Sequence, residues 1–255
     1  MTVRTLQKWH GAGNDFLVEV SDEGTAIWWS RDRIRAVCER TTGVGADGLA
    51  LATLGSPVMM VLYNADGSTA EMSGNGVRCL AAAVRRTTNA DWTTLDVLTE
   101  SGLRTVTLAM DGSSGYGSVD MGRVSFVEPL KGSLGVANVG NPHVVVRDDH
   151  SWSDTLREGM AEQWARQMGG ANVEFVRVID RGRLELRVIE RGVGWTMACG
   201  TGSVAAVAVF QREGLVDSDV LVDNPGGQLR VQLSDHTAAL SGPVQFVADV
   251  EWLDA

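Results

Sequence analysis

Two short segments of the chain place a small polar side chain directly before a Gly-x-Gly sequence. The first is Ser73-Gly-Asn-Gly, and the second is Cys199-Gly-Thr-Gly, about half the chain later. Each leads into a run rich in alanine and valine, which predicts a helix that is buried on nearly every face. The backbone N–H groups of such a helix start can hold a carboxylate, because they lack internal acceptors and the helix dipole favours negative charge there.

A cysteine at a helix start can also move protons. We expect this position to lower the pKa of the Cys199 thiol towards neutrality, so that its thiolate is a general base and its thiol a general acid. Arg191, eight residues upstream, can form a two-pronged hydrogen bond with a carboxylate. Two simpler interpretations stay open at this point. A lone cysteine is often a small core residue, and Ser73 is also a good helix cap that follows a turn.

Three smaller motifs contain an asparagine beside glycine, proline or a strand start. They place Asn14 in His-Gly-Ala-Gly-Asn-Asp-Phe, Asn141 and His143 in Gly-Asn-Pro-His, and Asn172 in Asn-Val-Glu-Phe. Separately they are weak signals, since asparagine is common in turns. The sequence has no spacing typical of metal ligands, no phosphate-binding loop and no lysine in a setting for a pyridoxal Schiff base. We therefore predict no metal and no cofactor.

Composition narrows the class of protein. A length of 255 residues suits two domains, and 44% apolar with 21% charged residues is usual for a globular protein. The net charge of −10 argues against nucleic acid and anionic membranes as partners. Three widely spaced cysteines fit a reducing compartment, and the N-terminus has no apolar signal core. The longest apolar run, 204–210, is too short to cross a membrane. We expect a cytoplasmic protein.

The two glycine-started helices suggest an internal duplication. Helices are also predicted over 29–39 and 155–168, and apolar alternation predicts strands around 184–188 and 229–233. The expected fold class is α+β, with two pseudo-symmetric domains that each wrap a mostly antiparallel sheet around a central helix. The expected first domain covers 1–118 with a return strand at 244–255, and the expected second domain covers 119–243.

Taken together, the motifs resemble those of diaminopimelate epimerases in type and in order. The shared set is His-Gly-x-Gly-Asn-Asp-Phe, Gly-x-Gly-Ala-Asp-Gly, Asn-Ala-Asp-Gly-Ser, Gly-Asn-Gly-x-Arg-Cys, Gly-Asn-Pro-His, Asn-Val-Glu-Phe-Val and Glu-Arg-Gly-x-Gly-x-Thr-x-Ala-Cys-Gly-Thr-Gly. The resemblance covers nearly the whole chain. It implies two domains that close on the substrate, and inversion at one α-carbon of diaminopimelate by two cysteines on opposite faces, without cofactor or metal. It also implies a role in lysine biosynthesis.

The resemblance implies roles for individual residues. The positions expected to contact the substrate are Asn14, Asn64, Asn141, Asn172, Glu190 and Arg191. The backbone of Gly74, Asn75, Gly200 and Thr201 would bind the reacting carboxylate, with His143 in support. Asn64, Asn172 and Arg191 resemble the family's anchor for the distal amino-acid end, which favours diaminopimelate over a substrate with one amino-acid group. The expected partner is a small amino acid, and a homodimer is left open.

Two positions depart from the family pattern and make this an atypical member. Ser73 stands where the family has its other catalytic cysteine, and Trp195 stands where glutamate is usual. A hydroxyl loses its proton far less readily than a thiol, so two-base inversion by Ser73 and Cys199 is in question.

Three explanations of the serine compete. It is an engineered replacement of cysteine, or a natural divergence with altered chemistry, or the mark of a non-catalytic amino-acid-binding protein. Altered chemistry here means one-base isomerisation or dehydration of another amino acid or specialised metabolite, as the related proline racemase group implies. Epimerisation of LL-/meso-diaminopimelate is the function we expect first.

Overall fold

The computed structural model describes residues 3–235 and 237–253, which form two compact units. Unit 1 consists of Met1–Val119 and Gly242–Ala255, and unit 2 of Asp120–Ser241. The chain passes between the units within two strands, β7 (Ser114–Gly122) and β16 (Ala238–Leu253). Among the described residues, no helix is both long and apolar enough to span a membrane.

Unit 1 is a closed ring of eight strands. Its order is β1-β2-β3-β4-β5-β6-β7-β16, and β16 also pairs with β1. Most neighbours are antiparallel, but β2–β3 and β4–β5 are parallel. The strands not yet given are β1 (Val3–Gly11), β2 (Asn14–Ser21), β3 (Gly48–Thr53), β4 (Val58–Asn64), β5 (Thr94–Thr99) and β6 (Gly102–Asp111).

Unit 2 has a similar succession of strands, although no pairing among the described residues closes it into a ring. Its order is β8-β9-β10-β11-β12-β14-β15 followed by the first residues of β16, and β13 pairs with β12. Here β10–β11 and β12–β14 are the parallel pairs. The strands are β8 (Ser125–Val127), β9 (Gly135–Asn138), β10 (Pro142–Arg147), β11 (Asn172–Asp180), β12 (Arg183–Glu190), β13 (Gly194–Thr196), β14 (Asp219–Asn224) and β15 (Gly227–Leu233).

Each parallel pair is joined through a helix, because parallel neighbours need a crossover connection. In unit 1 the crossovers contain α1 (Arg31–Cys38) and α2 (Gly74–Thr88). In unit 2 they contain α3 (Asp154–Gln167) and α4 (Gly200–Arg212). The predicted α+β class with duplicated halves is therefore confirmed. The predicted return strand is longer than expected: β16 already begins at Ala238, because its first residues pair with β15.

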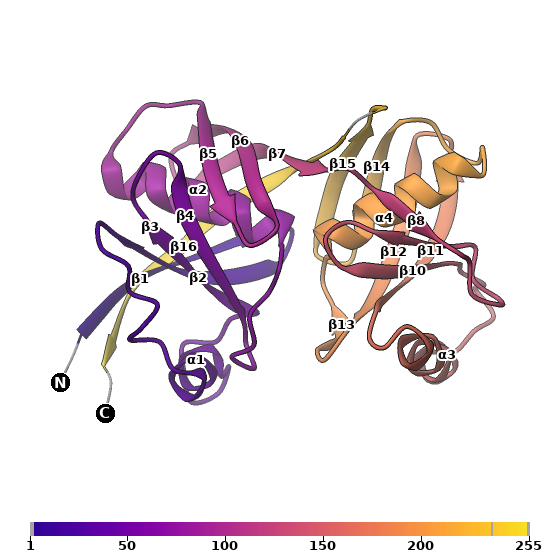
Figure 1. Ribbon diagram of the computed structural model, residues 1–255, viewed down its shortest axis with the longest axis horizontal. Coiled ribbons are helices and arrows are strands. Elements are labelled where there is room, and N and C mark those ends of the chain that lie inside the picture. The colour runs from indigo at the N-terminus through magenta and orange to yellow at the C-terminus, as the bar shows by residue number, and fades with distance from the viewer. Residues whose placement is uncertain (1–2, 236, 254–255) are drawn as a thin grey trace. The chain divides into compact units, whose positions relative to one another are not determined.

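The second helix of each unit is the central one. Within unit 1, α2 lies among the strands in Figure 1, and it contacts β1, β2, β3, β5 and β6. Within unit 2, α4 contacts β9, β10, β11, β12 and β15. All residues of 74–84 and of 200–210 are buried, as the alanine- and valine-rich runs predicted. The predicted start was slightly late, since both helices begin at the first glycine and not after the second.

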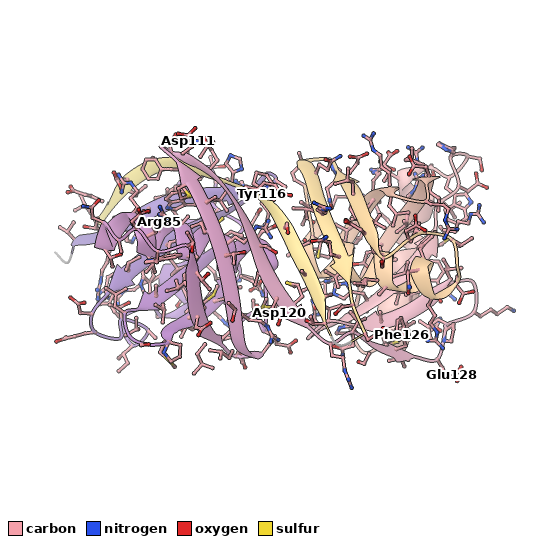
Figure 2. The ribbon with its side chains drawn as sticks, turned by 90° about the horizontal axis from the view of Figure 1, so that it is seen from above. Arg85, Asp111, Tyr116, Asp120, Phe126 and Glu128 are labelled. Atoms are coloured by element: carbon pink, nitrogen blue, oxygen red, sulfur yellow. The ribbon has the colours of Figure 1, made fainter. Side chains whose placement is uncertain are left out.

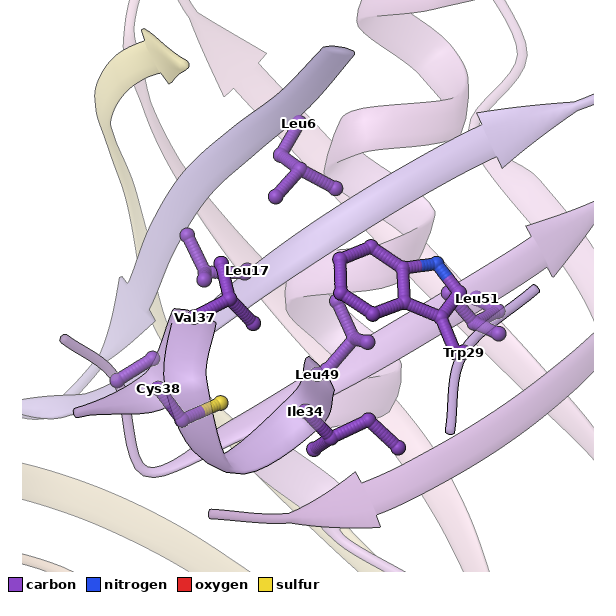
Figure 3. Packing of buried hydrophobic residues seen from close by; sticks show 9 residues of the cluster. Leu6, Leu17, Trp29, Ile34, Val37, Cys38, Leu49 and Leu51 are labelled. Atoms are coloured by element: carbon purple, nitrogen blue, oxygen red, sulfur yellow. The ribbon is translucent and has the colours of Figure 1, made fainter. Parts of the chain in front are cut away.

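The first helix of each unit covers the outside of its sheet. Helix α1 begins at a capping serine, Ser30, whose side chain accepts a hydrogen bond from the backbone N–H of Arg33. Its buried face inserts Ile34 and Val37 among apolar residues of β1, β2 and β3, and Figure 3 shows this packing. Helix α3 packs in the same way through Trp164. The outer helices hold the sheets, while the central helices begin inside them.

The core under α1 provides a test of the packing. Ile34 is fully buried, whereas Ile27, seven residues earlier, is fully exposed. Replacing Ile34 by alanine removes apolar contacts and leaves a cavity, so Ile34→Ala is expected to lower the free energy of unfolding by about 2–4 kcal/mol. Ile27→Ala is the matched control and should change it by no more than about 0.5 kcal/mol. Chemical denaturation of both variants measures the difference, and equal effects would contradict this packing.

Candidate functional site

In unit 1, Ser73 caps the start of α2. Its backbone is extended, with φ −143° and ψ 115°, and its Oγ accepts a hydrogen bond of 3.1 Å from the backbone N–H of Gly76. A Cβ on Gly76 would lie 3.3 Å from that Oγ, so glycine leaves room for the cap. In the described part of the chain, no hydrogen bond occupies the backbone N–H groups of Gly74 and Asn75. Two free donors therefore remain at this helix start.

The side chains beside this helix start form a chain of amide hydrogen bonds. Asn75 donates through Nδ2 to Oδ1 of Asn14 at 3.1 Å, and Asn14 donates through Nδ2 to Oδ2 of Asp47 at 2.8 Å. Arg40 contacts Asp47 at 2.6 Å and Asp15 at 2.7 Å. Two of the predicted site residues, Asn14 and Asn75, are thus held together in fixed orientations.

Asn64, a third predicted residue of unit 1, is held differently. It closes the turn after β4, where its Nδ2 donates to Oγ of Ser68 at 3.0 Å. Its backbone pairs with Gly48 at the start of β3, the strand that follows Asp47. The structure places Asn64 at the same strand ends as Asn14 and Asp47, without a side-chain hydrogen bond to either.

In unit 2, Cys199 caps the start of α4 in the same way. Its Sγ accepts a hydrogen bond of 3.3 Å from the backbone N–H of Gly202, and it lies 3.5 Å from Oγ1 of Thr201. A Cβ on Gly202 would lie 2.7 Å from Oε1 of Glu174, so glycine is needed for the helix start to pass this carboxylate. Among the residues that the structure describes, no hydrogen bond occupies the backbone N–H groups of Gly200 and Thr201.

The surroundings of Cys199 correct one expectation from the sequence. We expected the helix start to lower the pKa of the thiol, but burial and the negative charges of Glu190 and Glu174 raise this pKa well above its ordinary value. The hydrogen bonds from Thr201 and Gly202 act in the opposite direction and are outweighed. Cys199 therefore carries its proton at neutral pH in the unliganded protein. Cys38 and Cys79 are also buried, and burial raises the pKa of each to about 12.

A buried polar triad lies beside Cys199. His143 and Glu174 are both fully buried, and Nδ1 of His143 lies 2.7 Å from Oε1 of Glu174. Nε2 of His143 lies 2.8 Å from Oδ1 of Asn141. The other oxygen of Glu174 has no hydrogen-bond partner among the described residues. Sequence reasoning selected Asn141 and His143 but missed Glu174, although the Asn-Val-Glu-Phe motif contains it.

The remaining predicted residues of unit 2 lie at one end of β11 and β12. Oδ1 of Asn172 accepts a hydrogen bond of 2.9 Å from the backbone N–H of Arg191, and Oε1 of Glu190 accepts one of 2.6 Å from Thr196. Asn172 also pairs with His143 across β10 and β11. These contacts link the predicted substrate-contacting residues of unit 2 into one neighbourhood around the start of α4.

Trp195, the second departure from the family pattern, is a packing residue. Its ring lies 6.0 Å from that of Phe175, its Nε1 donates to Glu158 of α3 at 2.8 Å, and the guanidinium of Arg187 stacks on it at 4.2 Å. These contacts fasten β13 to α3 and β11. No group of His, Cys, Asp and Glu that could hold a metal occurs within residues 3–235 and 237–253.

Comparison with known proteins assigns this chain to a protein family. The family model described as diaminopimelate epimerase matches residues 6–127 and 135–247. A diaminopimelate epimerase from Clostridium perfringens is 31% identical over 97% of this chain and 99% of its own length. One from Synechocystis sp. is 33% identical over 95% of this chain and 96% of its own length. The chain belongs to the diaminopimelate epimerase family, a family of isomerases.

The fold agrees with this assignment. A solved structure of a predicted epimerase from Pseudomonas aeruginosa aligns with a TM-score of 0.77 at 16% identity. The alignment covers 99% of this chain and 100% of that one. The family membership expected from the motifs is confirmed. The roles of the individual site residues stay predictions.

The raised pKa of Cys199 can be tested by alkylation. The labelling rate of Cys199 should rise steadily from pH 7 to pH 9, because the thiolate fraction is small at neutral pH and grows with pH. In Glu190→Gln one opposing charge is gone, so the pKa falls and labelling at pH 8 should be about three- to tenfold faster.

Glu213→Gln, at the other end of α4, is the matched control and should leave the rate unchanged. Iodoacetamide with peptide mapping provides the measurement. A rate that is already at its plateau at pH 7 would show that Cys199 is a thiolate after all.

Proposed function

We propose that this protein inverts the α-carbon of an amino acid without a cofactor, and that its substrate is LL-/meso-diaminopimelate. The observation that supports this most directly is the pair of free backbone N–H groups at each of two buried helix starts. Removal of an α-proton moves negative charge onto the neighbouring carboxylate. Donors already aimed at that carboxylate stabilise the developing charge without reorganisation.

In this proposal, the free N–H groups of each helix start bind a carboxylate of the substrate. They are those of Gly74 and Asn75 on α2 and those of Gly200 and Thr201 on α4. Cys199 and Ser73 act on the α-proton from their respective helices. The amide side chains of Asn14 and Asn141 contact the same end of the substrate, and their hydrogen bonds within each unit fix the direction in which they donate.

The distal end of diaminopimelate carries a second carboxylate and ammonium. Asn64, Asn172 and Arg191 are proposed to bind it, since they offer amide donors and a guanidinium fork. Arg191 is exposed, and its backbone is tied to the buried Asn172. Retention of all three groups favours a substrate with two amino-acid ends.

Because the pKa of Cys199 is raised, the positive charge of the substrate's α-ammonium can contribute to catalysis by lowering it. Glu190 opposes ionisation of the thiol in the unliganded protein. An α-ammonium bound next to Glu190 would neutralise that charge, so the pKa of Cys199 falls once substrate is present. The Cys199 thiolate therefore forms when the substrate, with its α-proton, is bound. We also propose that the reaction needs no cofactor and that the protein is cytoplasmic. A homodimer is left open.

A second candidate function is one-base chemistry on another amino acid. It is favoured by Ser73, whose Oγ has a hydrogen bond only from Gly76 among the described residues. Without a carboxylate or histidine partner, the hydroxyl has no group to take its proton. Such a site removes the α-proton from one face of the substrate and returns it to the same face. Alternatively, the carbanion reacts further in an isomerisation or a dehydration. The remaining alternative is a protein that binds the amino acid without catalysis.

The comparison of wild type with Ser73→Cys decides among these functions. With diaminopimelate as substrate, circular dichroism follows inversion and deuterium wash-in follows proton abstraction. Wild type should exchange the α-proton of one stereoisomer faster than it inverts it. Ser73→Cys should raise inversion by about 10²–10⁴-fold, the usual contribution of a general acid–base group.

Cys199→Ser is the control and should abolish both signals. Fast and equal inversion by wild type and Ser73→Cys would show that the serine suffices. Exchange without inversion in both proteins would favour one-base chemistry, and neither signal in either protein would favour a binding role.

A further inference from the structure

A fully buried arginine, Arg78, lies in the second turn of α2. The surrounding strands make room for it with glycine. A Cβ on Gly117 of β7 would lie 3.1 Å from Cδ of Arg78, and a Cβ on Gly11 of β1 would lie 3.4 Å from its Nη2. Gly117 directly follows Tyr116, which Figure 2 labels on β7. The barrel interior is shaped to hold a guanidinium.

The guanidinium turns back towards the start of its own helix. Nη1 donates to the carbonyl oxygen of Gly74 at 3.1 Å, and Nη2 donates to Oδ1 of Asn75 at 2.6 Å. Its Nε is buried without a hydrogen-bond partner, and none of the described carboxylates forms an ion pair with Arg78. Both acceptors lie in the first turn of α2, beside the free N–H groups.

Arg78 keeps its charge in this setting. Burial lowers its pKa to about 10, which leaves the guanidinium protonated at neutral pH. A buried charge without a counter-ion is strongly destabilising in proteins, so its retention calls for a compensating anion.

The other buried arginine of this kind in the described structure is fully compensated. Arg157 of α3 forms an ion pair with Asp148 at 2.8 Å and donates to backbone carbonyls nearby. Of these two buried arginines, Arg157 has a carboxylate partner and Arg78 has none among the described residues.

The two helix starts differ in charge. On α4, Val204 follows Cys199 by the same five positions that separate Arg78 from Ser73. The start of α4 has an apolar residue there and two carboxylates near its cap, Glu174 and Glu190. The start of α2 has the buried cation of Arg78, and the carboxylates connected to its amide chain, Asp47 and Asp15, are paired with Arg40. An anion is therefore held more strongly at the start of α2 than the shared helix geometry alone would give.

We propose that Arg78 is the anion-positioning residue of this protein. Its charge attracts a carboxylate to the free N–H groups of Gly74 and Asn75. Its hydrogen bond to Oδ1 of Asn75 fixes the amide groups of Asn75 and Asn14 in their donating orientation. The proposal deepens the proposed function, because the carboxylate in question is that of the substrate, and Arg78 acts on it from behind the helix start.

Two variants of Arg78 distinguish an effect of its positive charge from a purely structural role in the fold. Arg78→Lys keeps the charge, whereas Arg78→Gln has similar size and no charge. Sodium sulfate serves as the anion probe, with sodium chloride at equal ionic strength as the reference, and the thermal unfolding midpoint is measured in both. The general stabilising effect of sulfate on folded proteins is common to all variants and cancels in the comparison.

Wild type and Arg78→Lys should show an extra rise of the midpoint in sulfate, and Arg78→Gln should lose it. The apparent affinity for sulfate should fall by roughly ten- to hundredfold in Arg78→Gln, the effect of losing one charged partner. In chloride, the midpoint of Arg78→Gln reflects two opposing changes, the removal of an uncompensated charge and the loss of the hydrogen bonds to Gly74 and Asn75, so the response to sulfate is the deciding measurement. Arg157→Gln is the control: it should lower the midpoint and keep the extra rise in sulfate.

The proposal is overturned if Arg78→Gln responds to sulfate as wild type does, whatever its midpoint in chloride. Arg78 would then only brace the barrel. This outcome is separate from failure of the proposed function. If wild type does not act on diaminopimelate, the substrate assignment is wrong, while the sulfate comparison still decides the role of Arg78. If wild type does act on it, KM should rise in Arg78→Gln and recover in Arg78→Lys.

Discussion

Each central helix begins inside its own unit, and its first backbone N–H groups must be satisfied where the sheets exclude most of the water. The first turn of a helix has four N–H groups without internal partners. In each unit the capping side chain takes only one of them, at Gly76 through Ser73 and at Gly202 through Cys199. Among the others, the N–H groups of Gly74 and Asn75 on α2 and of Gly200 and Thr201 on α4 have no acceptor in the described part of the chain. The β–α–β crossovers place these donors at strand ends, and the glycines allow the cap to fold over the turn. An anion-binding function follows from this constraint.

The capped start of the central helix has different charged groups around it in the two units. Around the start of α2, the guanidinium of Arg78 is buried without a carboxylate partner among the described residues, while Asp15 and Asp47 are paired with Arg40. Around the start of α4, the charges are those of Glu174 and Glu190, and they raise the pKa of the neighbouring thiol. The start of α2 thus has a buried guanidinium close by, whereas the start of α4 has two carboxylates close to a protonated thiol. Geometry alone, which is nearly the same in both halves, would not have indicated this difference.

The sequence predicted what depends on local pattern and left out what depends on contacts across the sheet. Gly-x-Gly after Ser73 and Cys199 located both central helices, since helix caps and glycine are read along the chain. The ionisation of Cys199 was predicted wrongly, because the helix start was visible in the sequence, whereas the burial of the thiol, the largest cause of its raised pKa, follows only from the folded structure. Arg78 was missed because an arginine within an apolar helix is usually exposed, and only Gly11 and Gly117, far away in the sequence, make it a buried residue.

Ser73 is a weak base, but it is well suited to cap the helix and to donate a hydrogen bond. Its Oγ accepts the N–H of Gly76, so a lone pair is used in capping and the hydroxyl proton is free to be donated. A serine at this place is a sound cap and a hydrogen-bond donor, and it needs no change of charge to be either. Cys199 differs, because a thiol ionises more readily than a hydroxyl, and its pKa is raised by burial together with the charges of Glu190 and Glu174. In the proposed function, Cys199 is therefore the group that removes the α-proton. Ser73 serves as a helix cap with a hydroxyl proton to donate, and it is a weaker base than the cysteine usual at this position.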